Sequence, residues 1–166
     1  MKISMHAMSH DVFKKALTQL LHILEKGAAN AKTRNFEPNV FVGLRLAPDM
    51  LPFSKQIQLT SDFAKNSMAR LAGIDPPKFE DNEATLDELV ARVKKTLDYI
   101  GTVPVAALEG SEDRDIKIPL RDRTVEFKGL AFLQNWALPN FFFHYVTAYN
   151  ILRHNGVDVG KRDFLG

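Results

Sequence analysis

The stretch TLDELVARVKKTLDYIG, residues 85–101, is the most regular part of the chain and decides its fold class. Its apolar residues recur at intervals of three or four, which places them on one face of a helix: Leu86, Leu89, Val90, Val93, Leu97 and Ile100. Thr85 and Glu88 have the spacing of a capping box, in which each side chain binds a backbone N–H at the helix start. The pattern therefore predicts a helix that Gly101 ends.

Two more amphipathic helices are indicated upstream of this one. Apolar residues at helical spacing predict a helix from about Ser9 to Ala28 and another from Pro48 to Ala72. Gly73, followed by two prolines, gives the second of these a clear end. Pro38 can open a short helix between them, because proline suits the first helical turn.

The segment downstream has a different period. Apolar residues alternate with polar ones from Ile116 to Phe127, on both sides of a polar turn, which predicts a short β-hairpin. Pro119 excludes a central strand, because proline cannot donate to the ladder of hydrogen bonds. A lone hairpin is marginally stable, so we expect it to lie against the helices.

The last helical region runs from about Gly129 to Asn155 and contains Pro139, which predicts a kink or a break inside it. Gly156 is a suitable stop, and residues 157–166 are expected to form an irregular tail. Four long helices with short connections predict an all-α fold: an antiparallel four-helix bundle with a small β-hairpin before the last helix. We interpret residues 1–166 as a single domain.

Composition excludes several classes of function. The 166 residues are 45% hydrophobic, with 22 basic and 20 acidic residues and no basic stripe, so we expect no nucleic-acid partner. The chain has no cysteine, which removes disulfides and thiolate chemistry. We find neither a signal peptide nor an apolar run long enough for a bilayer, so the expectation is a cytoplasmic protein without a membrane partner.

His144 is the candidate functional residue in the last helix. On a helical wheel it lies at the edge of the apolar arc, so its side chain is expected to point into the bundle. A helical metal pair needs a second ligand three or four residues away, and those positions hold only the weak or non-ligating residues Asn140, Phe141, Thr147 and Ala148. His154 is too far along the helix. We therefore predict no metal and no cofactor, and a hydrogen bond to His144 from Gln58, Ser61, Asn140 or Thr147.

Two interpretations of His144 stay open at this point: a core histidine with one hydrogen bond, or the catalytic group of a pocket. The pocket would be lined by polar and aromatic side chains of the second and last helical regions: Gln58, Ser61, Asn140, Tyr145 and Trp136. His6 and His10 also have the spacing of a metal-binding pair, with Asp11 as the only evident carboxylate. Such pairs arise easily by chance, and this one needs a helix that begins before His6, so we interpret it as a chance pair.

Four stretches carry a family resemblance: RLAPDMLPFSKQIQLTSDFAK, RLAG, LPNFFFHYVTAYNILRHNGV and GKRDFLG. Together they closely resemble a bacterial family described as domain of unknown function nineteen-ninety-three, which is grouped with the DinB/YfiT-like proteins. The resemblance implies an antiparallel four-helix bundle that is often dimeric. It also implies a superfamily that includes metal-dependent, thiol-linked transferases and hydrolases.

The resemblance implies a metal site that this chain has lost in part. In metal-binding relatives one histidine comes from the second helix and a His-x-x-x-His pair from the last. His144 is similar to the first member of that pair, but Ala148 stands at the second position, and the second helix has no histidine. Gln58 and Ser61 are the nearest replacements, and neutral oxygens are poor Zn²⁺ ligands.

Three functions remain possible from the sequence. The first is a protein with a degenerate metal site that binds an unknown small molecule between the second and last helices. The second is a metal-dependent DinB-like transferase or hydrolase that uses His144. The third is a helical homodimer with a purely structural or interaction role, and a homodimer is the expected partner in all three.

Overall fold

The structure is a computed structural model and describes residues 3–166. Its helices and strands follow in chain order: α1 (Met5–Met8), α2 (His10–Thr33), η1 (Pro38–Gly43), α3 (Phe53–Ala72), α4 (Leu86–Thr102), η2 (Val105–Leu108), η3 (Ser111–Asp113), β1 (Asp115–Pro119), β2 (Thr124–Lys128), α5 (Gly129–Phe132), η4 (Leu133–Ala137), α6 (Leu138–His154) and α7 (Lys161–Leu165). Among the described residues, no helix combines the length and the hydropathy needed to cross a bilayer.

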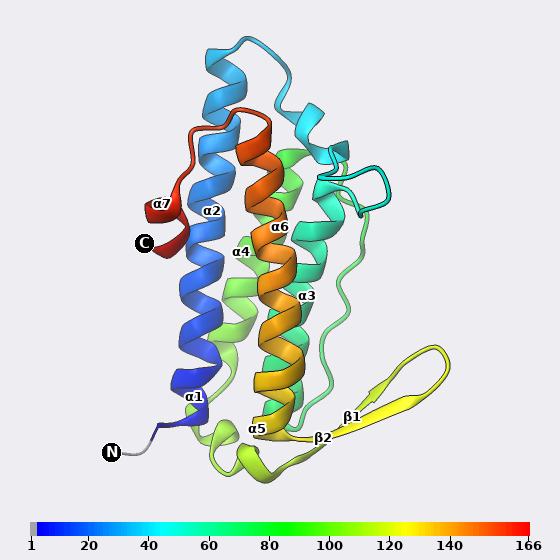
Figure 1. Cartoon of the computed structure of the whole chain (residues 1–166). Helices are drawn as coiled ribbons and strands as arrows, with labels where there is room; N and C mark the ends of the chain where they lie inside the picture. The colour runs from blue at the N-terminus through cyan, green and yellow to red at the C-terminus, as the bar shows by residue number, and fades with distance from the viewer. Residues whose placement is uncertain (1–2) are drawn as a thin grey trace.

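The four long helices α2, α3, α4 and α6 form a bundle (Figure 1). α2 and α6 run in one direction, and α3 and α4 run in the opposite direction. α3 packs on both α6 and α4, and α4 packs on α2. Residues 73–85 carry the chain back along the outside of the bundle between the two parallel helices, and we call this segment the strap. The predicted helical bundle with a hairpin before the last helix is confirmed.

The core lies along the bundle axis and comes from the predicted apolar stripes. Leu17 and Leu24 of α2, Ile57 of α3 and Val93 of α4 are fully buried. Phe13 and Phe141 pack edge to face with ring centroids 5.0 Å apart, which joins α2 to α6. Burial of large apolar side chains from every long helix supplies the main stabilisation of the fold.

The observed helix ends match the predicted ones at Thr85 and Gly73, where residues next to the end form the cap. The hydroxyl of Thr85 accepts a hydrogen bond from the backbone N–H of Glu88 at 3.2 Å, and the Glu88 carboxylate accepts from the N–H of Thr85 at 2.9 Å. Gly73 ends α3 in the left-handed conformation, with φ of 73°. Gly101 was expected to stop α4, but the helix runs through it to Thr102.

Other boundaries move because proline and tertiary contacts decide them. α3 begins at Phe53, after Pro52 and not at Pro48, since the residue before a proline is disfavoured in helical conformation. At the N-terminal end, helix begins earlier than expected, because α1 already starts at Met5. The hydroxyl of Ser4 accepts from the N–H of Ala7 at 3.1 Å and caps this short helix.

The hairpin is present as expected, but the expectation that it lies against the long helices is wrong, because outside its own ladder it packs mainly on the short helix α5 at their base. β1 and β2 are antiparallel, with Ile116 opposite Phe127 and Pro119 at the last pair, and the arm projects from one end of the bundle (Figure 1). A turn of π-helix, Leu133–Ala137, precedes α6, and Pro139 lies in its first turn. The expected break at Pro139 is therefore a π-turn, which widens the helix where the proline lacks an N–H.

The tail is not irregular throughout, as the sequence suggested, because it contains α7. Asp163 accepts a hydrogen bond from the backbone N–H of Gly160 at 2.7 Å, which starts the helix. The same carboxylate binds His22 at 2.9 Å and Lys26 at 3.0 Å on α2. These interactions lower the pKa of Asp163 strongly. Tertiary contacts to α2 thus create a short helix that periodicity alone cannot reveal.

Arg92 of α4 fastens the strap to the two parallel helices. Its side chain is almost completely buried and reaches Glu83 at 2.9 Å, Asp81 at 2.9 Å and Asp62 of α3 at 3.0 Å. It also donates to the backbone carbonyl of Glu80 at 2.9 Å. Burial opposes the charge, but the hydrogen bond to Glu83 and the surrounding carboxylates raise the pKa of Arg92.

Phe79 adds a second attachment of the strap. Its ring lies between the ammonium groups of Lys65 from α3 and Lys95 from α4, at 4.3 Å and 4.2 Å from the ring centroid. Lys65 is buried and also donates to the carbonyl of Pro77 at 2.7 Å. The strap is therefore held by charge on both helices.

We predict that Arg92→Met lowers the free energy of unfolding by about 3 kcal/mol, because it leaves partly buried carboxylates without their counter-ion. Urea denaturation followed by circular dichroism measures the change. Arg123→Met is the matched control, since Arg123 is exposed at the hairpin turn. Equal stability of the two variants would show that the strap does not depend on Arg92.

Candidate functional site

His144 lies on α6 with its imidazole against α3. The residue is 9% exposed, and its Nδ1 is 2.8 Å from the side-chain oxygen of Gln56. Phe63 stacks on the imidazole, with the ring centroids 5.7 Å apart and an interplanar angle of 15°. The prediction that His144 is buried beside the second long helix is confirmed.

The orientation of Gln56 decides which nitrogen of His144 carries the proton. The Gln56 amide nitrogen donates to the carbonyl of Leu51 at 3.0 Å, which turns the amide oxygen toward the imidazole. An amide oxygen can only accept, so Nδ1 of His144 is the donor and Nε2 keeps its lone pair. Burial lowers the pKa of His144, and the neutral imidazole is the stable form in this position.

The expected hydrogen-bond partners of His144 were wrong. Gln58 donates to the Glu83 carboxylate of the strap at 2.8 Å, because it stands two residues, or about 200°, around the helix from Gln56. Within residues 3–166 the buried hydroxyl of Ser61 has no hydrogen-bond partner, and Asn140 donates to the carbonyl of Trp136 at 2.7 Å. The Thr147 hydroxyl also binds its own helix, at the carbonyl of Phe143.

The correct partner had a signal in the sequence. Gln56 and Phe63 are seven residues apart, which places them two turns apart on one helix face, and both touch His144. Choosing the glutamine on the same face as an aromatic residue would have found Gln56.

The aromatic residues expected at the same pocket lie elsewhere. Tyr145 donates its hydroxyl to the carbonyl of Phe164 at 3.1 Å and stacks on that ring at 4.3 Å, so it faces α7. Trp136 packs near Phe127 of the hairpin, with centroids 5.9 Å apart. The expected pocket residues are therefore spread over several faces of the fold.

The surroundings of His144 do not fit the metal site that the family resemblance implies. The polar atom facing its imidazole is the neutral amide oxygen of Gln56, and Ala148 follows one turn later on α6. Structural and catalytic zinc sites use imidazole, thiolate or carboxylate ligands, three or four at a time. One imidazole beside an amide and a methyl group does not provide such a set.

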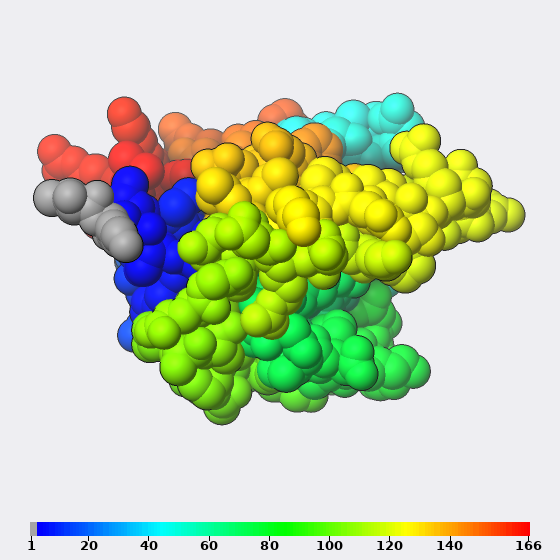
Figure 2. Space-filling view, turned by 90° about the horizontal axis from the view of Figure 1, so that it is seen from below, coloured from blue at the N-terminus to red at the C-terminus, as the bar shows by residue number. Residues whose placement is uncertain are grey.

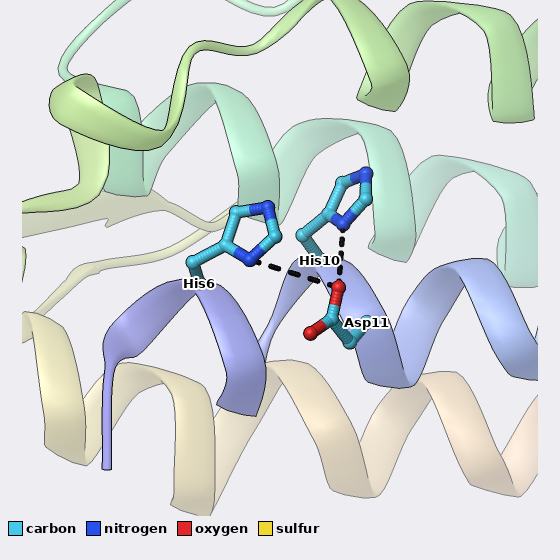
Figure 3. A group of neighbouring side chains, drawn as sticks. All are labelled: His6, His10 and Asp11. Carbon is cyan, nitrogen blue, oxygen red and sulfur yellow. Dashed lines mark hydrogen bonds and ion pairs between the residues drawn. The ribbon is translucent and has the colours of Figure 1, made fainter. Parts of the chain in front are cut away.

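A second group of ligating side chains lies at the start of the chain: His6, His10 and Asp11 (Figure 3). One ligand atom from each residue lies within 4.8 Å of the other two. Nδ1 of His10 is 2.9 Å and Nδ1 of His6 is 3.6 Å from the same Asp11 oxygen, Oδ1. The hydrogen bond from His10 is the main cause that lowers the pKa of Asp11.

The junction between α1 and α2 brings these three residues together. Ser9 separates the helices, and its hydroxyl donates to the carbonyl of Met5 at 2.6 Å. The chain therefore continues close to its helical path, and the imidazoles of His6 and His10 stack with centroids 4.4 Å apart. The sequence analysis required a helix that begins before His6 for this histidine pair, and α1 begins at Met5.

A groove of about 590 Å³ lies at this end of the bundle and includes His6 in its wall. Its apolar wall comes from three chain segments: Ile3, Met5, Met8, Val105, Leu108 and Leu130. Its other polar side chains are Ser4, Glu109, Glu112 and Gln134. Figure 2 shows this end, where the N-terminal helix (blue), the segment after α4 (yellow-green) and the turn after the hairpin (yellow-orange) meet.

We call this feature the base groove, and the sequence analysis missed it. Its residues come from short helices and connections, where no apolar period is long enough to be recognised. Val105 and Leu130 stand in two short apolar runs that are 25 residues apart in the sequence, and only the fold places them together.

Comparisons with known proteins agree with the fold. A family model described as a domain of unknown function, DUF1993, matches residues 5–165. A crystal structure of a DinB family member from Shewanella denitrificans is 36% identical in sequence, covers 97% of this chain and 91% of that chain, and superposes with a TM-score of 0.91. No curated protein matches. The chain belongs to the DUF1993 family and has a DinB-like fold.

Proposed function

We propose that this protein binds a small molecule and that the base groove is the binding site. The observation that supports this proposal is a groove of about 590 Å³ with a mostly apolar wall and a few polar side chains. Pockets for small ligands typically have volumes of about 300–1,000 Å³ and this mixed lining.

Exposed apolar residues gather at the base groove. Ile3 is 74% exposed, Val105 55% and Leu130 37%, although each is a large apolar side chain. These side chains give the groove an apolar rim, and pockets for small ligands are lined mainly by apolar groups. The wall therefore favours a ligand with an apolar body.

The polar residues of the base groove suggest the rest of the ligand. Glu109 and Glu112 add two carboxylates, and Gln134 adds an amide. Carboxylates accept hydrogen bonds and attract positive charge. We propose a ligand that combines an apolar body with a hydrogen-bond donor or a cationic group.

The sequence-based proposal of a ligand between α3 and α6 remains as a second candidate. It is supported by the neutral imidazole of His144, whose Nδ1 is fixed by Gln56 and whose Nε2 keeps its lone pair. Such a nitrogen is suited to accept a proton or a hydrogen bond from a ligand. Gln58, Ser61, Asn140, Tyr145 and Trp136 were proposed as the further ligand-binding residues.

We also propose that the protein forms a homodimer, and the outer side of α6 offers a surface for it. Phe143 is 58% and Val146 38% exposed on the outer side of this helix. A two-fold axis beside α6 would bury both side chains against their copies. The cytoplasmic location expected from the sequence stays a prediction.

We predict that Val105→Gln weakens small-molecule binding about fivefold, because it removes apolar contact from the groove wall. The measurement is a fragment screen by NMR on the untagged protein, followed by titration of the best fragment. Val40→Gln is the matched control, since Val40 is also 55% exposed in a short helix and does not line the base groove. If His144→Gln abolishes binding while Val105→Gln has no effect, the ligand lies at the second candidate site.

We predict that His144 makes stability depend on pH. Because its pKa is lowered in the folded state, the unfolded chain binds a proton more readily. The contribution of the neutral His144 to the free energy of unfolding is therefore fully present above about pH 6.5. It is lost as the pH falls below that value. Urea denaturation of the wild type and of His144→Gln at several pH values tests this, and the fall should be smaller in the variant.

We predict that the wild-type protein sediments as a dimer and that Phe143→Glu shifts it toward the monomer, because two carboxylates would meet at the proposed axis. Sedimentation velocity at several concentrations measures this. Ile74→Glu serves as the control, since Ile74 is 50% exposed at the end of the strap beside α3. A wild-type monomer at all concentrations would contradict the proposal.

A further inference from the structure

We propose that His6, His10 and Asp11 bind one divalent transition-metal ion, such as Zn²⁺, at the wall of the base groove. This site is separate from His144, around which the family's metal ligands are missing. Ion binding can be measured without any small molecule, so this inference does not depend on the proposed function.

The two distances to Asp11 are close to those of a shared ion, and the ligand atoms of the two histidines lie within 4.8 Å of each other. Two ligand atoms that each lie about 2.1 Å from one ion are about 3.0–3.4 Å apart at octahedral or tetrahedral angles. Oδ1 of Asp11 is 2.9 Å from Nδ1 of His10 and 3.6 Å from Nδ1 of His6. Shifts of a few tenths of an ångström would therefore bring both pairs to coordinating distance.

The side chains also have the right direction and freedom. Nδ1 of both imidazoles faces the Asp11 carboxylate (Figure 3), so an ion that displaces the proton from Nδ1 of His10 would find both nitrogen atoms directed at one region. The Asp11 side chain is 57% exposed and can move outward to admit an ion. The side chains of His6 and His10 are only 24% and 13% exposed, which holds the two nitrogen ligands in place.

A simple ion pair explains only part of this arrangement. A hydrogen bond between His10 and Asp11 accounts for those two neighbours in sequence. It does not account for His6, which comes from a separate helix, stacks on His10 at 4.4 Å and turns its Nδ1 to the same oxygen. The hydroxyl of Ser9, bonded to the carbonyl of Met5, fixes the turn that makes this convergence possible.

The donor set indicates the ion and what it could do. Two imidazoles and one carboxylate suit Zn²⁺, Fe²⁺ and Co²⁺ and leave coordination positions open. His6 is shared by the ligand group and the groove wall, so an ion held there lies beside the proposed small-molecule site. A ligand in the base groove could then bind the ion through an oxygen, nitrogen or sulfur atom.

The test is a titration of the metal-free, untagged protein with Zn²⁺ by calorimetry and with Co²⁺ by visible absorption. We expect one ion per chain and a Co²⁺ spectrum of low coordination number. His6→Ala, His10→Ala and Asp11→Asn should each weaken binding about tenfold or more. His154→Ala is the control and should bind as the wild type does, because His154 is exposed at the far end of α6.

Two outcomes would overturn the inference. One is a wild type that binds Zn²⁺ no more tightly than the double variant His6→Ala/His10→Ala, and the other is equal weakening by His154→Ala. If a variant does not fold, the wild type still decides the question, because Zn²⁺ must shift the imidazole ¹⁵N resonances of His6 and His10 and leave those of His22 unchanged. Failure of this titration would not affect the Val105→Gln experiment, which uses no metal.

Discussion

The guanidinium of Arg92 is the constraint on which the arrangement of the bundle depends. Two of the long helices, α3 and α4, run in the same direction, so the chain must return along the bundle between them. The returning strap is short of apolar residues and cannot hold its place by burial alone. Arg92 compensates, because it binds Asp81 and Glu83 of the strap and Asp62 of α3 from inside α4. One side chain of α4 thus joins three segments of the chain, and removal of it would leave several carboxylates without their counter-ion.

Local features of the fold could be predicted, and features that depend on distant contacts could not. The capping box at Thr85, the stop at Gly73 and the hairpin around Pro119 are each encoded within a few residues, and each is present. Gly101 failed as a stop because a glycine inside a helix costs only about 1 kcal/mol, which packing of α4 outweighs. α7 was missed because Asp163 holds it to α2 through His22 and Lys26, far away in sequence.

The candidate sites show the same division. The position of His144 on the helical wheel predicted that it is buried. Whether Gln56 or Gln58 binds it depends on the rotation of α3 about its axis, which the sequence does not give. His6 and His10 were visible as a pair, and their convergence on Asp11 depended on a serine that joins two helices without a break in direction. The base groove had no periodic signal, because its walls come from short helices and connections. The long helices form the bundle in this protein, and the short helices and connections at one end build the base groove.

The π-turn before α6 has a practical consequence for spectroscopy. Trp136 lies in this turn and is the only tryptophan of the chain. Its indole is half-buried and packs near Phe127 of the projecting arm, and not in the centre of the bundle. Its emission therefore reports on the junction between arm and bundle, whereas far-ultraviolet dichroism reports on the long helices. The chain thus carries two built-in optical signals for two parts of one domain, and detachment of the arm can be observed apart from loss of the bundle.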